Sequence, residues 1–344
     1  MVKLTSTFAA LLAGASAVFG ASLQQVNNFG TNPTNVKMFI YVPDKIASAT
    51  NAPILVAAHY CTGTAQAYFS GTPYRQLADQ HGFIVIYPNA PDSGGCWDVH
   101  TQATFTHNGG GDSRGIASMV TYTLDKYKAN PDRVFVTGTS SGAMMTQVLM
   151  GAYPDIFKGG AAFAGVPFGC FGGSGMWNSQ CAQGQQSRTA QAWGDLVRNA
   201  YPGYTGPRPK LAIYHGTNDE TLNYNNHKEA IKQWTNVFGY SETPQSTQAN
   251  SPVSGWTRSI YGPLFQAITA QGVSHNIAIQ GNDVMNWFQL NVANPTTSVP
   301  GPTTTTPGQP TTTVVVPTTT YTPPVQPTPT EQPGTVAKWG QCGG

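Results

Sequence analysis

The sequence predicts an α/β protein in which helices flank a central, mostly parallel sheet. Short and nearly continuous apolar runs, bounded by Gly, Pro, Asn and Asp, are typical of strands that are buried on both faces of such a sheet. Helical periodicity lies between these runs, and this alternation places functional sites at the carboxyl ends of the strands. The pattern occupies residues 21–292, a length suited to one α/β domain.

The predicted strands are the seven apolar runs, at residues 37–42, 54–59, 83–87, 133–137, 159–164, 211–215 and 265–270. The clearest predicted helix spans residues 113–128, where apolar side chains recur at spacings of three, four and seven residues. Asp112 precedes this helix and is its expected N-cap. A second helical pattern follows Gly142, and a third closes the domain around Val284 and Phe288.

Three outer segments differ in composition from this domain. Residues 1–20 carry one lysine, an apolar run and then small residues, which is the layout of a secretory signal peptide and is too short to span a membrane. Residues 293–335 are dense in Thr and Pro and predict an extended, O-glycosylated linker. Residues 336–344 follow the linker. We therefore expect a secreted, extracellular glycoprotein that does not enter a membrane.

The low charge of the chain limits its partners. Charged residues make up 9% of the sequence, against about 25% in ordinary globular proteins, and the formal net charge is +2. Because no basic stripe is present to follow a phosphate backbone, we do not expect nucleic acid to bind. No group of Cys and His has metal-ligand spacing, so neither a metal nor another cofactor is expected. We expect a monomer whose partner is an uncharged polysaccharide.

The chain has five cysteines, and an odd number in a secreted protein calls for an explanation. Cys342 lies outside the domain and is expected to stay unpaired. The other four allow three pairings. We expect Cys170–Cys181, which closes a short Gly-rich loop, and Cys61–Cys96. Both members of the second pair follow predicted strands that end on the same side of the sheet.

The segment Gly138-Thr139-Ser140-Ser141-Gly142 has the pattern Gly-x-Ser-x-Gly between a predicted strand and a predicted helix. A sharp turn at this point strains the serine backbone, and the glycines remove side chains that would clash. The turn raises Ser140 Oγ at the edge of the sheet, where the helix N-terminus favours a developing oxyanion. Ser141 is the rival nucleophile, but the spacing between the glycines selects Ser140. The context therefore predicts an α/β-hydrolase.

A hydrolase serine needs an acid and then a histidine later in the chain. Asp219 lies just after the strand at residues 211–215, with Glu220 as its neighbouring alternative. His275 follows the last predicted strand and is the expected base. His59 and His215 end strands, and we expect each to hold a loop by hydrogen bonds.

The oxyanion hole needs two backbone N–H donors. The amide of Ser141 is the first. The second is expected from the loop after the strand at residues 54–59, at Tyr60 or Cys61, and we favour Cys61. A Cys61–Cys96 disulfide would stiffen this loop.

Taken together, these motifs resemble carbohydrate esterase family one, in the fungal branch of acetylxylan and feruloyl esterases, whose relatives include secreted polyhydroxyalkanoate depolymerases. The resemblance covers residues 23–290 and rests on five segments: His59-Tyr60-Cys61-Thr62, Gly95-Cys96-Trp97-Asp98, the Gly-x-Ser-x-Gly turn, His215-Gly216-Thr217-Asn218-Asp219 and Gly272-Val273-Ser274-His275. It implies Ser140 as nucleophile, Asp219 as acid and His275 as base, with the Cys61 and Ser141 amides as the oxyanion hole. Tyr60 departs from the glycine that is usual in the family.

A second resemblance concerns the C-terminal residues. Trp339 with Gly-Gln-Cys342-Gly-Gly is similar to the opening of a family-one cellulose-binding module, in which the aromatic residue stacks on cellulose. We expect a fragment this short to be unfolded and Trp339 to be inert.

The resemblance implies an acetylxylan esterase that acts on acetylated xylan in plant cell walls, with Trp97 as a candidate cleft residue. A feruloyl esterase acting on arabinoxylan is the same-class alternative. An inactive wall- or cellulose-binding protein that keeps the hydrolase scaffold is the alternative of another class.

Overall fold

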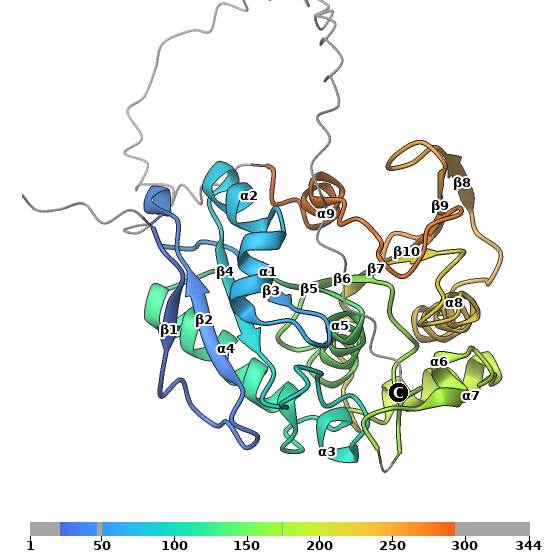
Figure 1. The fold of residues 1–344 in the computed structure, drawn as a ribbon, viewed down its shortest axis with the longest axis horizontal. Helices are drawn as coiled ribbons and strands as arrows, with labels where there is room; N and C mark the ends of the chain where they lie inside the picture. The colour runs from blue at the N-terminus through green and yellow to red at the C-terminus, as the bar shows by residue number, and fades with distance from the viewer. Residues whose placement is uncertain (1–20, 47–49, 174, 293–344) are drawn as a thin grey trace, which may run out of the picture. The chain divides into compact units, whose positions relative to one another are not determined.

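A computed structural model describes residues 21–46, 50–173 and 175–292. The expected signal peptide at 1–20, linker at 293–335 and module fragment at 336–344, with Trp339 and Cys342, lie outside the described residues. The described part of the chain forms one sheet with helices on both of its faces (Figure 1). The predicted fold class is therefore confirmed.

The sheet has ten strands in the order β1-β2-β4-β3-β5-β6-β7-β10-β9-β8. The six strands from β4 to β10 in this order pair in parallel, while β1, β2, β9 and β8 pair antiparallel at the two edges. The bounds of the strands are β1 (Gln24–Val26), β2 (Lys37–Tyr41), β3 (Ile54–Ala58), β4 (Ile84–Asn89), β5 (Val134–Thr139), β6 (Gly159–Phe163), β7 (Lys210–Gly216), β8 (Ser246–Ala249), β9 (Trp256–Gly262) and β10 (Phe265–Ala270).

The edge strands β1, β8 and β9 were not predicted. All four residues of β8 are exposed, and β1 has no buried residue, so neither strand has the continuous apolar run that marks the interior strands. The predicted run at residues 265–270 coincides with β10, and the other predicted strands differ from the observed bounds only at their ends.

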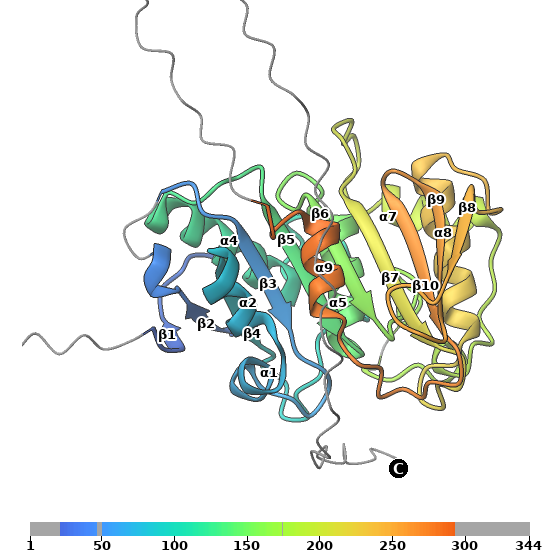
Figure 2. The same ribbon diagram turned by 90° about the horizontal axis from the view of Figure 1, so that it is seen from above.

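Helices cover the two faces of the sheet unequally (Figure 2). One face packs against α1, α2 and α9, and the other packs against α4, α5, α7 and α8. The bounds of the helices are η1 (Asp44–Ile46), α1 (Ala65–Gly71), α2 (Tyr74–His81), α3 (Gln102–Phe105), α4 (Asp112–Tyr127), α5 (Ser141–Ala152), α6 (Ser179–Ala182), α7 (Ala190–Arg198), α8 (Asn225–Phe238) and α9 (Gly281–Phe288).

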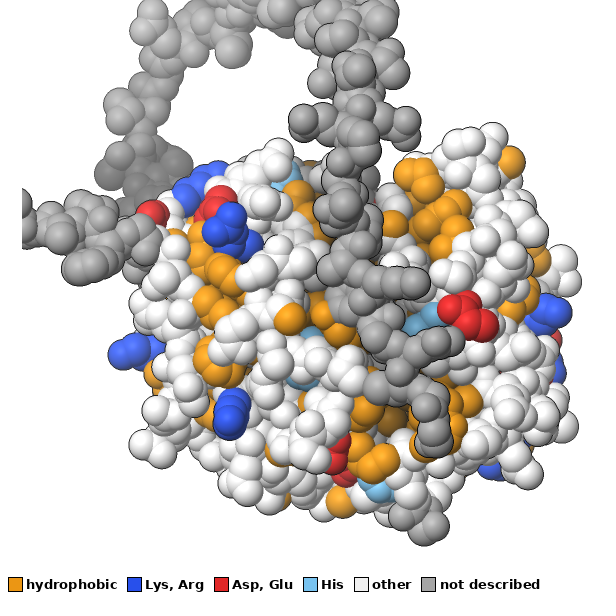
Figure 3. All heavy atoms as spheres, viewed as in Figure 1, with side chains coloured by type: hydrophobic (Ala, Val, Ile, Leu, Met, Phe, Trp, Pro, Cys, Tyr) orange, Lys and Arg blue, Asp and Glu red, His pale blue; other side chains and the backbone are white. Residues whose placement is uncertain are grey.

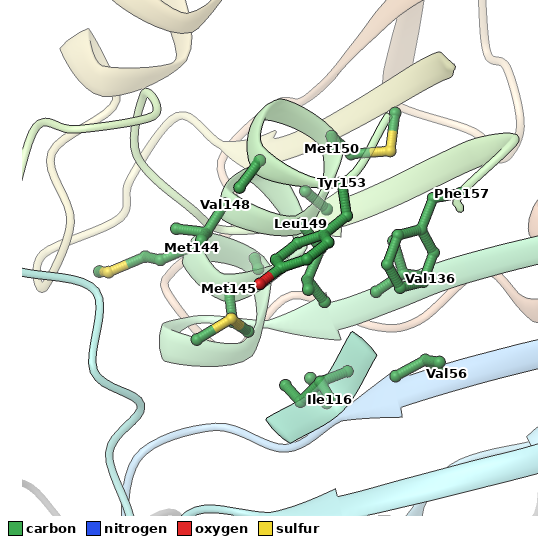
Figure 4. Close-up of a cluster of buried hydrophobic side chains, with 14 of the residues drawn as sticks. Val56, Ile116, Val136, Met144, Met145, Val148, Leu149, Met150, Tyr153 and Phe157 are labelled. Atoms are coloured by element: carbon green, nitrogen blue, oxygen red, sulfur yellow. The ribbon is translucent and has the colours of Figure 1, made fainter. Parts of the chain in front are cut away.

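The helix α5 carries the nucleophile turn at its start and is buried at every position. Its apolar side chains meet Val56 of β3, Val136 of β5 and Ile116 of α4 in a single cluster (Figure 4). A helix that is apolar on all sides is stable only inside a core. This burial fixes the N-terminal end of α5 against the central strands.

The prediction that Asp112 is the N-cap of α4 is wrong. The structure makes Gly111 the N-cap and Asp112 the first residue of α4. The Asp112 carboxylate instead accepts a hydrogen bond of 2.9 Å from the Asp98 amide, so it stabilises the preceding loop as well as the positive end of the helix dipole.

The structure contains the two expected disulfides, Cys61–Cys96 and Cys170–Cys181. The first joins the loops that follow β3 and β4, which are parallel neighbours. Among the described residues, no helix is long and apolar enough to cross a membrane. The same residues contain no group of three or more His, Cys, Asp or Glu that could hold a metal ion.

Candidate active site

Ser140 lies at the sharp turn between β5 and α5, as the N-cap of the helix. Its φ is 56° and its ψ is −120°, a backbone conformation that residues other than glycine rarely adopt. The turn is held tightly, because a Cβ on Gly142 would be 2.6 Å from the His59 carbonyl oxygen and would also collide with Ala58. Only glycine lets α5 approach β3 this closely, so the strained turn is imposed by backbone packing.

Three side chains from separate loops form one line of hydrogen bonds. Ser140 Oγ is 2.9 Å from His275 Nε2, and His275 Nδ1 is 2.8 Å from Asp219 Oδ2 and 3.0 Å from Oδ1. Because both Asp219 oxygens are acceptors, the proton of a neutral His275 ring lies on Nδ1. Nε2 then accepts the Ser140 hydroxyl proton, which is the arrangement that a general base requires.

Asp219 is the anionic end of this line, and its side chain is fully buried. Burial raises the pKa of its carboxyl group, but hydrogen bonds from His215 and His275 and their charge more than offset this effect. The net result is a pKa well below its ordinary value. Oδ1 also accepts the amides of Thr221 at 3.0 Å and Leu222 at 2.7 Å, so the carboxylate stays ionised and fixed in orientation.

The alternatives to Ser140 and Asp219 have other contacts. Ser141 Oγ accepts the Trp97 amide at 2.9 Å, so the hydroxyl of this rival nucleophile connects the turn to the Cys96 loop. Glu220 accepts the backbone amide of His275 at 3.3 Å, whereas the imidazole ring itself meets Asp219. The structure therefore brings together Ser140, Asp219 and His275.

The prediction that Trp97 is a cleft residue is wrong. Its side chain is only 1% exposed, and its indole N–H donates to the His59 carbonyl at 2.8 Å. The ring packs beside His59, with centroids 5.0 Å apart. Trp97 therefore supports the end of β3 from within the core and does not line a cleft.

The two predicted oxyanion donors belong to the turn after β3 and to the start of α5. Ser141 is the first helical residue of α5, so its amide has no acceptor within the helix. Cys61 lies in the turn after β3, and the flanking bonds Thr62 N–H to Gly94 at 2.8 Å and Gly63 N–H to Tyr60 at 3.0 Å hold that turn. Among the described residues, neither the Cys61 nor the Ser141 amide donates to another backbone group. Both remain available for a ligand oxygen.

An open cavity of about 620 Å³ lies beside the Cys61–Cys96 loops. Its lining is mostly polar or glycine, including Thr62, Gly63 and Asn89, but it also includes the charged side chains of Lys37 and Asp92 and none of Ser140, Asp219 and His275. Charged side chains are sparse on the described surface of the face shown in Figure 3. The sparsely charged face suits a neutral, hydroxyl-rich ligand better than an ionic one.

Comparison with known proteins decides the family. Residues 36–252 match the family model described as esterase PHB depolymerase. The chain belongs to this family. The match ends before His275, so the third member of the hydrogen-bonded line lies beyond the part that the family model covers.

Named relatives of this esterase are acetylxylan esterases. It is 56% identical over 272 residues to acetylxylan esterase A of Aspergillus oryzae, covering 78% of this chain and 88% of the relative. It is 51% identical over 332 residues to acetylxylan esterase A of Talaromyces purpureogenus, covering 95% and 85%. The family and these relatives identify the chain as a serine carboxylic ester hydrolase.

Solved structures agree with the fold. The acetyl xylan esterase of Aspergillus awamori is 50% identical with a TM-score of 0.76, covering 78% of this chain and 99% of that protein. FphF, a fluorophosphonate-binding serine hydrolase of Staphylococcus aureus, has a TM-score of 0.51 at 16% identity, covering 80% and 100%. The second likeness shows a shared fold alone.

His59 and His215 were both expected only to hold loops, and the structure shows that their hydrogen-bond partners differ in kind. His59 Nδ1 is 2.7 Å from the Tyr60 carbonyl, and its Nε2 accepts the Ala90 amide at 3.1 Å, so its contacts are to backbone. His215 Nε2 is 2.8 Å from the Leu222 carbonyl but also 3.1 Å from Asp219 Oδ2. Sequence reasoning missed this second contact. Its one signal was the spacing of four residues between a strand-end histidine and the acid.

Proposed function

We propose that this esterase removes acetyl groups from acetylated xylan, with Ser140, Asp219 and His275 as its catalytic triad. The observation that carries the proposal is the line of hydrogen bonds from Ser140 Oγ through His275 to Asp219, at 2.9 and 2.8 Å. The substrate class is supported by identities of 56% and 51% to two acetylxylan esterases. The sparsely charged surface supports a neutral polysaccharide.

In the first half of the reaction, Ser140 Oγ attacks the acetyl carbonyl carbon while His275 Nε2 accepts the hydroxyl proton. The carbonyl oxygen becomes an oxyanion, which the Cys61 and Ser141 amides bind. Asp219 stabilises the imidazolium without taking its proton. When the tetrahedral intermediate collapses, His275 gives this proton to the xylose oxygen that leaves, and an acetyl ester remains on Ser140.

In the second half, water takes the place of the sugar. His275 Nε2 accepts a proton from the water as its oxygen attacks the acetyl ester, and the same two amides bind the new oxyanion. Collapse releases acetate, and His275 returns the proton to Ser140 Oγ. The cycle uses no external oxidant, metal or cofactor.

The test is acetate release from acetylated xylan, measured beside hydrolysis of methyl ferulate. We expect acetate release, and a loss of about 10⁴-fold or more in Ser140→Ala. Ser246→Ala, on the exposed edge strand β8, is the matched control and should retain wild-type activity. Full activity in Ser140→Ala would overturn the mechanism. Ferulate turnover without acetate release would overturn the substrate.

We also propose that residues 1–20 are a signal peptide, that 293–335 form a glycosylated linker and that 336–344 belong to a cellulose-binding module. The two disulfides support an oxidising, extracellular location. The alignment to the Talaromyces enzyme covers 95% of the chain and so continues past the esterase domain. Mass spectrometry of the protein from the culture medium, before and after removal of glycans, tests the signal peptide and the linker.

A further inference from the structure

His215 is the last side chain before the glycine that ends β7, and it lies under the turn that carries Asp219. Its side chain is 2% exposed. Nε2 is 2.8 Å from the Leu222 carbonyl oxygen and 3.1 Å from Asp219 Oδ2. One nitrogen of a buried imidazole therefore lies between two acceptors that belong to the same turn.

Those two acceptors assign the proton. A carbonyl oxygen and a carboxylate oxygen both need a donor, so His215 carries a hydrogen on Nε2 and shares it between them. Asp219 then receives four donors. The Thr221 and Leu222 amides bind Oδ1, while His215 and His275 are the nearest donors to Oδ2, at 3.1 and 2.8 Å. Oδ2 is thus shared by two imidazoles.

We propose that His215 is a positioning residue for the esterase reaction. Its Nε2–H holds Asp219 Oδ2 at the angle from which that oxygen orients His275, and it withdraws part of the anionic charge from the His275 contact. This proposal rests on the proposed function of the triad. His215 acts through Asp219 and does not contact the reacting atoms.

The geometry explains why a donor is needed on this side. The amides of Thr221 and Leu222 bind only Oδ1, and His275 lies within 3.0 Å of both oxygens, so His215 is the one donor that binds Oδ2 without also binding Oδ1 among the described residues. His275 lies in a loop after β10, and its side chain is 19% exposed. It is therefore less constrained than His215 as a partner of Asp219. His215 is anchored in the sheet and is the rigid one.

A purely structural role for His215 would use only the bond to the Leu222 carbonyl, which ties down the end of the turn. The two roles differ in what they change. Loss of the turn contact would lower stability and weaken activity without altering the ionisation behaviour of the site. Loss of the Asp219 contact would change the pH dependence, because an anion that loses a hydrogen-bond donor stabilises a neighbouring imidazolium more strongly.

The experiment compares His215→Leu with His215→Gln in the full-length enzyme, using p-nitrophenyl acetate. Leucine removes the donor, whereas glutamine can place an amide N–H where the imidazole Nε2–H lies. His227→Leu is the matched control. His227 is 2% exposed on α8, its ring centroid is 5.7 Å from that of His215, and its Nε2 has no partner among the described residues.

For His215→Leu we expect kcat to fall about 10- to 100-fold with little change in KM, the effect of losing a hydrogen bond to a charged group. The acidic limb of the kcat/KM profile should move to higher pH. His215→Gln should restore most of kcat and return that limb toward the wild-type position. His227→Leu should stay within about two-fold of wild type in kcat.

Unchanged kcat in a folded His215→Leu would overturn the proposal, and so would a lower kcat with the acidic limb unmoved. If His215→Leu does not fold, His215→Gln decides, because a folded glutamine variant with a low kcat and an unmoved acidic limb would overturn the proposal. Ser140→Ala is measured alongside. Activity in that variant would overturn the proposed triad, whereas an inactive Ser140→Ala with a normal His215→Leu would overturn the positioning role alone.

Discussion

The two sides of the nucleophile are built differently. On one side, the backbone at the end of β3 lies close to Gly142 of α5, and the hydrogen bonds of the buried His59 ring to described residues go to backbone groups. On the other, the loops after β7 and β10 bring together Asp219 and His275, which are 56 residues apart, and the buried His215 reaches the carboxylate itself. A local turn supplies the nucleophile, while the acid and base depend on two loops staying in register.

Each side of the nucleophile has a glycine whose position allows close backbone packing: Gly142 on the nucleophile side and Gly216 on the acid–base side. A Cβ on Gly142 would collide with the backbone of Ala58 and His59 at the end of β3, inside the sheet. A Cβ on Gly216 would collide with the backbone of Val273 and Ser274, in the loop that leads to His275. The first contact is surrounded by core, and the second lies between the end of β7 and the loop after β10. We therefore expect the nucleophile side to fail by unfolding and the acid–base side to fail by misalignment.

The largest expected effect is that of Asp219→Asn on the acid–base side. The asparagine oxygen can still accept the Thr221 and Leu222 amides, but its NH₂ group would face His275 Nδ1. The imidazole proton would then move to Nε2, and a protonated Nε2 can no longer accept the Ser140 hydroxyl proton. We expect kcat/KM for acetylated xylan to fall about 10⁴-fold, with the disulfides and fold intact.

Circular dichroism and urea unfolding give the control for this variant. A native-like spectrum with low activity supports the tautomer argument. Retention of more than a tenth of wild-type activity would contradict it.

Gly142→Ala is expected to act mainly on stability. Because the added methyl group meets backbone atoms of β3, α5 must move away from the sheet, at a cost of about 3 kcal/mol or more in the free energy of unfolding. Gly71→Ala, at the end of α1, is the matched control, since a Cβ there meets nothing within 4 Å. Urea unfolding measures both variants. Equal stabilities for the two would show that the close approach of α5 and β3 is not required.

The nucleophile turn was the part of the site that the sequence predicts best, because strand, turn and helix are consecutive in the chain. Chain order and strand ends were enough to nominate Asp219 and His275 as well. The Cys61–Cys96 pairing followed from two parallel strands that end on one side. In each case the signal was local, or it depended only on the direction of a strand.

What could not be predicted is non-local. The contact between His215 and Asp219 depends on how the turn after β7 folds back, and the burial of Trp97 depends on which core it enters. The edge strand β9 owes its structure to pairing with β10, and β8 owes its structure to pairing with β9, since β8 has no apolar run of its own. The cap of α4 shifted by one residue because the Asp112 side chain binds the Asp98 loop.

Gly216→Ala should lower activity more than stability, whereas Gly142→Ala should act mainly on stability. The Val273 carbonyl accepts the Asn218 amide at 3.0 Å, so a displaced Val273 carries the acid and base loops apart. A misplacement of about 1 Å in a catalytic group costs about 100-fold in rate. We expect kcat to fall by that factor, with a smaller loss of unfolding free energy than in Gly142→Ala. A stability loss as large as that of Gly142→Ala, with normal kcat in the folded fraction, would remove the contrast between the two sides.

The smallest expected effect is a pH-dependent loss of stability on the nucleophile side. Burial lowers the pKa of His59 to about 4 from 6.5, because its partners are backbone groups and no carboxylate compensates for a charge. The unfolded chain therefore binds a proton between these two pH values while the folded chain does not. The stability that the neutral ring provides is complete above about pH 6.5 and is lost progressively as the pH falls toward 4.

Between pH 7.5 and 5, this one group should lower the free energy of unfolding by about 2 kcal/mol. The variant His59→Asn keeps a donor near the Tyr60 carbonyl but cannot titrate, so its loss over the same interval should be smaller by that amount. Burial also lowers the pKa of His227, well below 6.5, and this contribution is common to both proteins and cancels in the difference. Urea unfolding of both proteins at pH 7.5 and 5 measures this difference in stability loss. An identical pH dependence in wild type and variant would mean that His59 is already charged in the folded enzyme, and that the end of β3 holds a charge as readily as the acid–base side does.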